Sequence, residues 1–297
     1  MSDLALTQTL DNQLSSKYND VAILQMQIAS GQALNQPSDN PAAVTQVLSL
    51  SSQAAQLTSW QANAETASSW LGTANNTANS ALQAMGSANT LLLQASNQGT
   101  QSATSYEAVG RQLQGVVSNL LQLVNTQYGG RALFAGTSAS PTAYDANGNY
   151  LGNADTPSVV IGAGAGAGQQ VALSVPGSAM FGSGAANVFA TLSTVANALM
   201  TGSPTTAQIS TAINALAGNI ASAQQASVIL GNATQQSSMA NASLTTQLSN
   251  VQANSANLKD VNIAQATSQL GLDTTSYQAA LWAASQAIPE TLMKFIA

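Results

Sequence analysis

The sequence contains no cysteine and no histidine, and charge is scarce: five Lys or Arg residues stand against eleven Asp or Glu residues in 297, a net charge of −6. Without thiols and imidazoles, the common zinc and iron–sulfur sites, cysteine nucleophiles and Ser-His-Asp triads are excluded. Five basic side chains spread along the chain cannot build a surface that follows a nucleic-acid backbone, and an anionic membrane would repel the chain. Carboxylate catalysis and structural roles are left.

Titratable groups are missing altogether from Thr156 to Leu258, a stretch of 103 residues. Long apolar runs are missing too, and the start Met1-Ser2-Asp3-Leu4 lacks the basic and apolar regions of a signal peptide. Hydrophobic residues nevertheless make up 45% of the chain, far more than in charge-rich disordered chains. We therefore expect a folded protein that, if exported, uses a route without a classical signal.

The strongest positive signal is a helical period. From Leu57 to Ala95 apolar residues recur at alternating steps of three and four, which indicates a long helix with an unbroken a/d seam. The seam positions are Leu57, Trp60, Ala64, Ala67, Leu71, Ala74, Ala78, Ala81, Met85, Ala88, Leu92 and Ala95. Its many alanines let helix axes approach closely, and the sustained period of 3.5 residues predicts a left-handed supercoil.

Further stretches repeat this rhythm. One runs from Tyr106 to Leu123, and another begins at Ile209 and continues to Leu258. Asn40 is predicted to cap a helix that begins at Pro41. Both ends of the chain carry apolar stripes, which consist of Leu10, Leu14, Val21, Leu24 and Ile28 at the N-terminus and of Tyr277, Leu281, Ala284, Ile288, Leu292 and Phe295 at the C-terminus. Pro289 is expected to kink or end the last helix.

The pattern changes between Tyr128 and about Gly184. Gly129-Gly130 is predicted to end a helix, Asn147-Gly148 is typical of a hairpin turn, and Val159–Ile161 and Val171–Val175 alternate as strands before a turn at Pro176-Gly177. Helix resumes near Asn187. This nesting predicts a mainly α fold: an elongated antiparallel coiled-coil rod formed by the N- and C-terminal segments, with a small central β insertion.

Three domains are expected from this organisation. Residues 1–40 with 260–297 would form a terminal helical assembly domain, residues 41–130 with 187–259 a long-helix rod, and residues 131–186 a β-rich inserted outer domain. The first and last segments would then lie side by side.

Motifs that suggest ligands have simpler explanations. Asp145 to Asn149 begins like a calcium loop, but Tyr150 and Thr156 stand where that loop needs Gly and Glu, so a turn is predicted. The run Gly162–Gly168 contains a G-x-G-x-x-[GA] string, but a strand rather than a helix follows it, so a surface loop is predicted. No metal, cofactor or catalytic residue is predicted.

Two further sets of residues, one of carboxylates and one of aromatic rings, have the composition of ligand sites. Asp3, Asp11 and Asp20 do not converge on one helix turn and have no basic partner in the pattern, which indicates a solvated face. The aromatic residues Trp60, Trp70, Tyr277 and Trp282 are interpreted as core or interface rather than as a ligand cage.

The terminal stripes point to assembly. Two amphipathic helices with almost no charge cannot bury their apolar faces within a two-helix hairpin. They pack either on the body of the same chain or on other chains, and the Pro-rich break beside them favours other chains. The predicted assembly interface is Leu10, Leu14, Val21, Leu24, Ile28, Tyr277, Leu281, Ile288, Leu292 and Phe295.

Several segments resemble one known family. The segment with Ser30, Gly31, Asn35, Pro37, Ser38, Asp39 and Pro41 is similar to the S-G-x-hydrophobic-N-x-P-S-D-D-P motif of the hook–filament junction proteins, the third hook-associated proteins of the flagellin superfamily. Gly130 to Gly136, which includes Phe134, resembles that family's exit from the helical domain. Leu258 to Ala266, with Asp260, resembles its C-terminal signature. Asn40 and Asn262 depart from the family's usual Asp, and charge is unusually low.

The resemblance implies a structural subunit and no enzyme. It implies export through the flagellar type III apparatus to the extracellular flagellum, with an export chaperone. It also implies a place in a ring of like subunits between the first hook-associated protein and flagellin. A flagellin-like filament subunit is the alternative within this class, and an exported carboxylate hydrolase using two of Asp145, Asp155, Asp260 and Asp273 is the alternative outside it.

The lack of titratable groups also predicts that stability depends little on pH. We therefore interpret the chain as one suited to acid surroundings, held by apolar seams and neutral hydrogen bonds.

Overall fold

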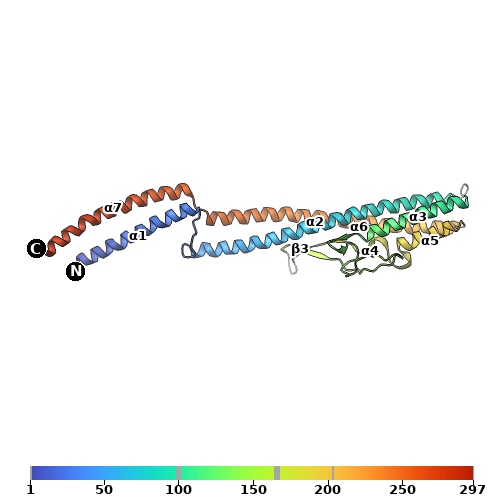
Figure 1. The fold of residues 1–297 in the computed structure, drawn as a ribbon, viewed down its shortest axis with the longest axis horizontal. Helices are drawn as coiled ribbons and strands as arrows, with labels where there is room; N and C mark the ends of the chain where they lie inside the picture. The colour runs from blue at the N-terminus through green and yellow to red at the C-terminus, as the bar shows by residue number, and fades with distance from the viewer. Residues whose placement is uncertain (1, 98–101, 164–167, 203, 297) are drawn as a thin grey trace. The chain divides into compact units, whose positions relative to one another are not determined.

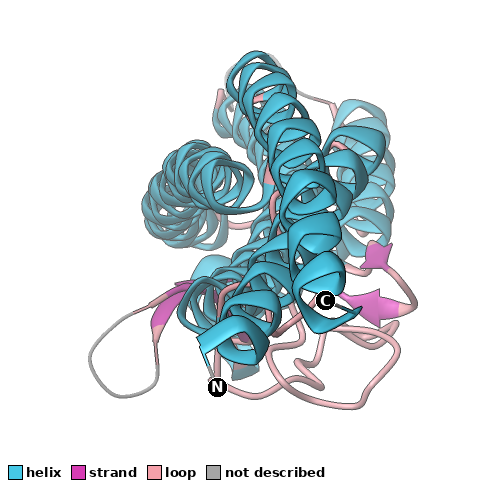
Figure 2. Ribbon diagram, turned by 90° about the vertical axis from the view of Figure 1, so that its left-hand side faces the viewer, coloured by secondary structure: helices cyan, strands magenta, loops and turns pink. Residues whose placement is uncertain are grey.

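A computed structural model describes residues 2–97, 102–163, 168–202 and 204–296, with side chains from residue 8 to residue 285 within these ranges. Helices dominate, and the few strands are short (Figures 1 and 2). The elements are α1 (Ser2–Ser30), α2 (Pro41–Ser96), α3 (Ala103–Val124), β1 (Gln127–Tyr128), β2 (Arg131–Ala132), β3 (Ser158–Gly162), β4 (Gln169–Ala172), α4 (Gly177–Phe181), η1 (Gly184–Ala186), α5 (Val188–Met200), α6 (Thr206–Lys259) and α7 (Ile263–Ile296). The predicted mainly α class with a small β insertion is confirmed.

The chain divides into two compact units. Residues 1–56 with 247–297 form one, called the terminal unit below, and residues 57–246 form the other, called the central unit. The helices α2 and α6 each contribute residues to both. The three-domain division expected from the sequence stays a prediction.

The predicted seam of α2 lies in the core of the central unit. Eleven of its twelve residues are buried, with exposures of 2% or less, and Trp60 is half-buried. The helix α6 runs antiparallel to this part of α2, as three side-chain hydrogen bonds show. Gln61 bonds to Thr245, the buried Ser237 hydroxyl donates to Ala64 O at 2.8 Å, and Ser227 bonds to Asn75. The helix–helix contact is therefore held by apolar side chains and by neutral hydrogen bonds.

The helices α3 and α5 pack on each other in the same unit. The Ser102 hydroxyl caps α3 by accepting from Ser105 N, and the Asn187 side chain caps α5 by accepting from Ala190 N at 2.6 Å. Gly110 marks a close approach, since a Cβ there would lie 2.8 Å from Ala196 O.

The β insertion is tied down by an aromatic cluster. Tyr144 packs against Tyr150, Phe181 and Phe189, with ring centroids 5.1, 6.3 and 4.8 Å away, and Phe134 packs edge-on against Phe181 at 5.8 Å. Burial raises the pKa of the Tyr144 hydroxyl, which donates to Gly182 O at 2.7 Å. The insertion thus shares one core with the helices of the central unit.

Local predictions in the insertion need corrections. The helix α3 ends at Val124, earlier than Gly129-Gly130, and those two glycines, with φ of 56° and 80°, instead turn the chain between β1 and β2. The strand β4 ends at Ala172, so Leu173 and Val175 lie outside it. Leu173 N donates to Pro157 O, but Pro157 has no N–H to return, which ends the ladder. Pro176-Gly177 leads into the short helix α4 rather than a simple turn.

Other predictions on helix ends have mixed outcomes. Asn40 caps α2 as predicted, with Ala43 N donating to its side-chain oxygen at 3.0 Å. The last helix does not end at Pro289, because α7 continues to Ile296, and a kink at Pro289 stays a prediction.

Candidate assembly interface of the terminal helices

The terminal unit has almost no core of its own. Among its described side chains the buried ones are Ala43, Val251, Ala266 and Asp273, three small or medium apolar residues and one carboxylate. All the fully buried large side chains belong instead to the central unit. The terminal unit therefore gains little from the hydrophobic effect by itself.

The helices α1 and α7 pack along each other, as expected for the first and last segments (Figure 1). Of the predicted interface residues, Leu10, Leu14, Val21, Leu24, Ile28 and Tyr277 are half-buried, and Leu281 is 41% exposed. The side chains of Ile288, Leu292 and Phe295 lie outside the described ones. The predicted α1 stripe thus contributes to a contact within the chain, and its role in contacts with other chains stays a prediction.

A second set of apolar side chains faces solvent. These exposed residues of the terminal unit are Tyr18, Ile23, Met26, Leu48, Ile263, Leu272, Leu281 and Trp282. Trp282 is 69% exposed, so of its two predicted roles, core or interface, only interface stays a prediction, whereas Trp70, at 8%, is core. Ile23, Met26 and Leu272 were not predicted from the stripes, because they do not occupy heptad positions. Contiguous patches of exposed apolar side chains are typical of surfaces that associate.

One charged pair lies between the helices. The Lys17 ammonium donates to Asp273 Oδ1 at 3.1 Å, and Gln269 Nε2 donates to Asp273 Oδ2 at 3.0 Å. The hydrogen bonds from Gln269 and Lys17 lower the pKa of the Asp273 carboxyl, and the bond to Asp273 raises the pKa of Lys17. Lys17 also lies 3.7 Å from Asp20, so the reading of Asp20 as an acid without a basic partner is wrong.

Aromatic rings lie next to this pair. The rings of Tyr18 and Tyr277 are 6.0 Å apart and tilted by 49°, beside a pocket of about 380 Å³ lined by these tyrosines, Leu14, Ser15 and Asn19. The α1–α7 contact thus combines half-buried apolar, aromatic and charged groups at one level.

The segment that follows α1 and the segment that precedes α7 are joined by backbone hydrogen bonds. Ala33 N donates to Lys259 O at 2.6 Å and Val261 N donates to Gly31 O at 3.1 Å, around an antiparallel bridge between Gln32 and Asp260. The chain leaving α1 is therefore tied to the chain entering α7.

The motif residues in this connection serve its folding. Gly31 has a φ of 71°, which a residue with a side chain adopts only under strain. The Ser30 hydroxyl accepts from Gln32 N, and the Asp39 carboxylate accepts from Asn35 N at 2.9 Å and Gln36 N at 2.8 Å. Pro37, Ser38 and Pro41 are exposed at the turn and at the start of α2.

Phe134 and Gly136 lie in the central unit, away from this connection in the sequence. Phe134 is fully buried and its carbonyl accepts from the Tyr150 hydroxyl at 2.9 Å. Gly136 has a φ of 69°, and a Cβ there would meet Asn153 Oδ1 at 2.3 Å. Both residues therefore hold the insertion together rather than forming a ligand site.

The predicted turn at Asp145 is confirmed. Its carboxylate accepts from Asn147 N, Asn149 N and Asn149 Nδ2, each at 2.8 Å, and these bonds, led by those from Asn149, lower the pKa of Asp145. Within the described part of the chain, no three His, Cys, Asp or Glu residues gather as a metal site would require.

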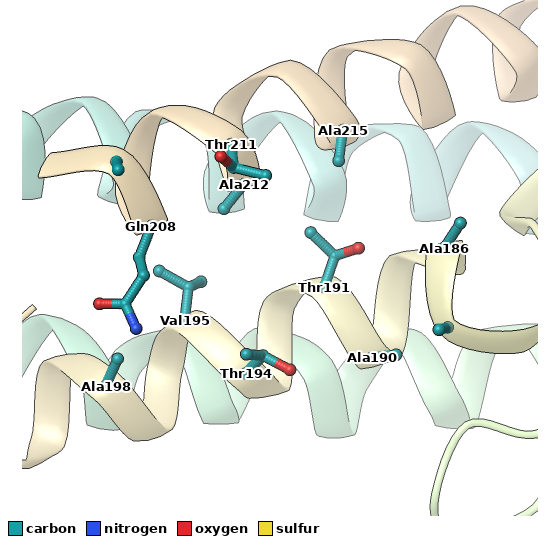
Figure 3. A pocket seen from close by; sticks show the side chains of 12 residues that line it. Ala186, Ala190, Thr191, Thr194, Val195, Ala198, Gln208, Thr211, Ala212 and Ala215 are labelled. Carbon is teal, nitrogen blue, oxygen red and sulfur yellow. The ribbon is translucent and has the colours of Figure 1, made fainter. Parts of the chain in front are cut away.

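A groove of the central unit lies between α5 and α6 (Figure 3). It holds about 500 Å³ and is lined by η1, α5 and α6 residues such as Ala190, Thr191, Val195, Gln208 and Ala212. None of its lining side chains titrates, so it offers no general acid or base. In the described residues no helix is long and apolar enough to cross a membrane.

Known proteins resemble the chain in its N-terminal part and in its fold. Residues 1–139 match the family model of the bacterial flagellin N-terminal helical region. This part of the chain is similar to that region. None of the curated proteins matches the sequence.

Solved structures extend the likeness over most of the chain. A putative flagellar hook-associated protein from Vibrio parahaemolyticus is similar with a TM-score of 0.68 and 18% identity, over 75% of this chain and 100% of that one. FlgL from Bacillus cereus gives 0.59 and 18%, over 70% and 99%, and flagellar hook-associated protein-3 from Legionella pneumophila gives 0.58 and 12%, over 70% and 98%. The resemblance predicted from the motifs is thus confirmed, and the shared feature is the flagellin-type fold.

Proposed function

We propose that this chain is a structural subunit of the bacterial flagellum that acts as an adaptor at the junction between hook and filament. The observation that carries the proposal is the combination of a hook-associated fold with a terminal unit that has exposed apolar side chains and almost no core. Neighbouring subunits would supply the missing faces, and the exposed Ile23, Met26, Leu272 and Trp282 would be covered on assembly.

Partners follow from this role. The first hook-associated protein would lie on one side, flagellin on the other, and like copies would complete a ring. The subunit would reach this extracellular place through the flagellar type III apparatus with the help of an export chaperone, and the predicted outer domain, residues 131–186, would face outward.

The alternatives are less well supported. The similar solved structures described above are hook-associated proteins, which disfavours a filament subunit. A carboxylate hydrolase would need two acids in one cleft, whereas the four pockets described in this structure are lined without Asp or Glu.

Deletion of the gene tests the proposal. Cells without an adaptor should keep intact hooks and shed flagellin monomers into the medium, and reintroducing the gene should restore filaments. Bare hooks with no flagellin in the medium would instead identify the chain as the filament protein. Normal filaments in the deletion strain would reject both flagellar roles.

A further inference from the structure

Each terminal helix carries one charged residue within its seam. Six half-buried positions of α1 follow steps of four and three, and they are Leu10, Leu14, Lys17, Val21, Leu24 and Ile28; the neighbouring Asp20, Ala22 and Gln27 are half-buried as well. In α7 six covered positions follow the same rhythm, and they are Ala266, Leu270, Asp273, Tyr277, Ala280 and Ala284; the neighbouring Thr274 is half-buried as well. Lys17 and Asp273 thus interrupt two otherwise uncharged seams, and they interrupt them opposite each other.

The two groups are covered to different degrees. The side chain of Asp273 is 10% exposed and that of Lys17 is 42% exposed. The carboxylate therefore depends on its donors inside the chain, Lys17 and Gln269, whereas the ammonium extends towards water beside Asp20. No further charged side chain among the described residues forms an ion pair with either seam group.

Apolar packing alone specifies the register between α1 and α7 poorly. Half of the α7 seam residues are alanines, and the same heptad contacts recur after a shift of seven residues. Such a shift would place Lys17 opposite Ala266 or Ala280, and Asp273 opposite Leu10 or Leu24. Either arrangement covers a carboxylate without its cation, which is unfavourable even where apolar contact is unchanged.

We propose that Lys17 and Asp273 are positioning residues that fix a single register between the terminal helices α1 and α7. A single polar position in a heptad seam sets register in this way in coiled coils, at some expense of stability. The inference concerns contacts within one chain and does not depend on the flagellar role. Its consequence is that Tyr18, Ile23 and Met26 of α1 stay at fixed levels relative to Leu272 and Trp282 of α7.

Tyrosine cross-linking reads this register directly. The Tyr18 and Tyr277 rings are 6.0 Å apart, so photo-oxidation of the full chain should join them as dityrosine, which mass spectrometry of proteolytic fragments locates. The Tyr144–Tyr150 pair of the central unit, with centroids 5.1 Å apart, is an internal reference that terminal variants should leave unchanged. A wild-type chain without the Tyr18–Tyr277 link would overturn the proposal.

Charge reversal tests the two residues. Lys17→Asp and Asp273→Lys should each lower the Tyr18–Tyr277 yield about fivefold, and the exchange Lys17→Asp with Asp273→Lys should restore most of it. The matched control Asp20→Asn, which removes the exposed partner of Lys17, should keep the wild-type yield. Single reversals that keep the link, or an exchange that fails to restore it, would contradict the register role.

An apolar replacement separates register from stability. In the double variant Lys17→Leu with Asp273→Leu, helix content and melting temperature should hold or rise, since apolar pairs often replace ion pairs without loss. The Tyr18–Tyr277 yield should nevertheless fall, because slipped registers then cost little. A double variant that keeps the wild-type yield would show that apolar packing alone sets the register.

Discussion

The hydroxyl of Ser237 in α6 donates a 2.8 Å hydrogen bond to the carbonyl oxygen of Ala64 in α2, and Ser237 is fully buried. It lies on an interface where the opposing seam residues are mostly alanines, so the two helices are close enough for a short side chain to span them. A neutral contact of this kind joins the two helices without a titratable group.

Replacing Ser237 by Ala should therefore destabilise the central unit by about 1 kcal/mol, the usual net value of one such hydrogen bond. Ser238→Ala, one position along on the exposed side of α6, should change stability by less than about 0.5 kcal/mol. Urea unfolding followed by circular dichroism measures both. Equal effects from the two variants would mean that the buried bond contributes nothing.

A second pair of variants should have opposite signs. Gly110→Ala puts a Cβ 2.8 Å from both Ala196 O and Met200 Cγ, and the forced separation of α3 and α5 should cost about 1 to 3 kcal/mol. Gly115→Ala, in the same helix with nothing within 4 Å, should stabilise by about 0.5 to 1 kcal/mol through helix propensity. The same urea unfolding measures both, and loss of stability in both variants would contradict the close-approach argument.

The helical part of this structure was predictable because its seam is apolar and uninterrupted. The steps from Leu57 to Ala95 specify one buried face, and the structure buries it. The terminal helices were harder, since Lys17 and Asp273 occupy seam positions and break the apolar pattern that identifies a seam. The predicted C-terminal stripe includes Leu281, but within the single chain Leu281 is 41% exposed while Ala280, outside the stripe, is half-buried.

A signal for the charged pair was nevertheless present. The predicted α1 stripe has a gap between Leu14 and Val21, and Lys17 fills it at the expected step. The end of β4 was not predictable from its own alternation, because it depends on Pro157 in the segment before β3. Local periodicity predicts which face is covered, whereas strand ends depend on the partner segment.

The pH dependence should differ between the two units. Among described side chains of the central unit, the ion pair is Glu107–Arg111 on the surface of α3, and Asp145 is bonded within an exposed turn. Its melting temperature should therefore stay nearly constant between about pH 3 and 7. A fall of more than about 10 °C, roughly 3 to 5 kcal/mol for a unit of this size, would contradict this expectation.

The terminal helices should respond to acid instead. The pKa of Asp273 is lowered by Gln269 and Lys17, so its contribution to folding is present above the unfolded value near 3.8 and is lost as pH falls through the lower folded value. The raised pKa of Lys17 adds stability below 10.5 that is lost as pH rises through its folded value. Helix content, measured by circular dichroism, should therefore fall at both low and high pH. Asp273→Asn should abolish the fall at low pH.

Limited proteolysis of the free chain should remove residues 1 to about 40 and about 260 to 297 first and spare the middle. The reason is that the terminal unit buries few side chains, so its helices open at little cost in free energy. Fragment masses after brief digestion identify the cuts. Equal resistance along the whole chain would contradict the low cost of opening these helices.

Trp282 offers the sharpest test of the association surface. Its ring is 69% exposed, so Trp282→Ser should leave the melting temperature of the free chain unchanged within about 1 °C. If the ring is covered in the assembly, the same change should weaken incorporation by about 2 kcal/mol or more, the loss typical of an interfacial tryptophan. Leu93→Ser, an exposed apolar change in α2 of the central unit, is the matched control and should assemble normally. The measurement is the number of filaments on cells that carry each variant as their sole copy. Filament loss with Trp282→Ser alone places the association surface on the terminal helices. Equal loss with both variants places it elsewhere.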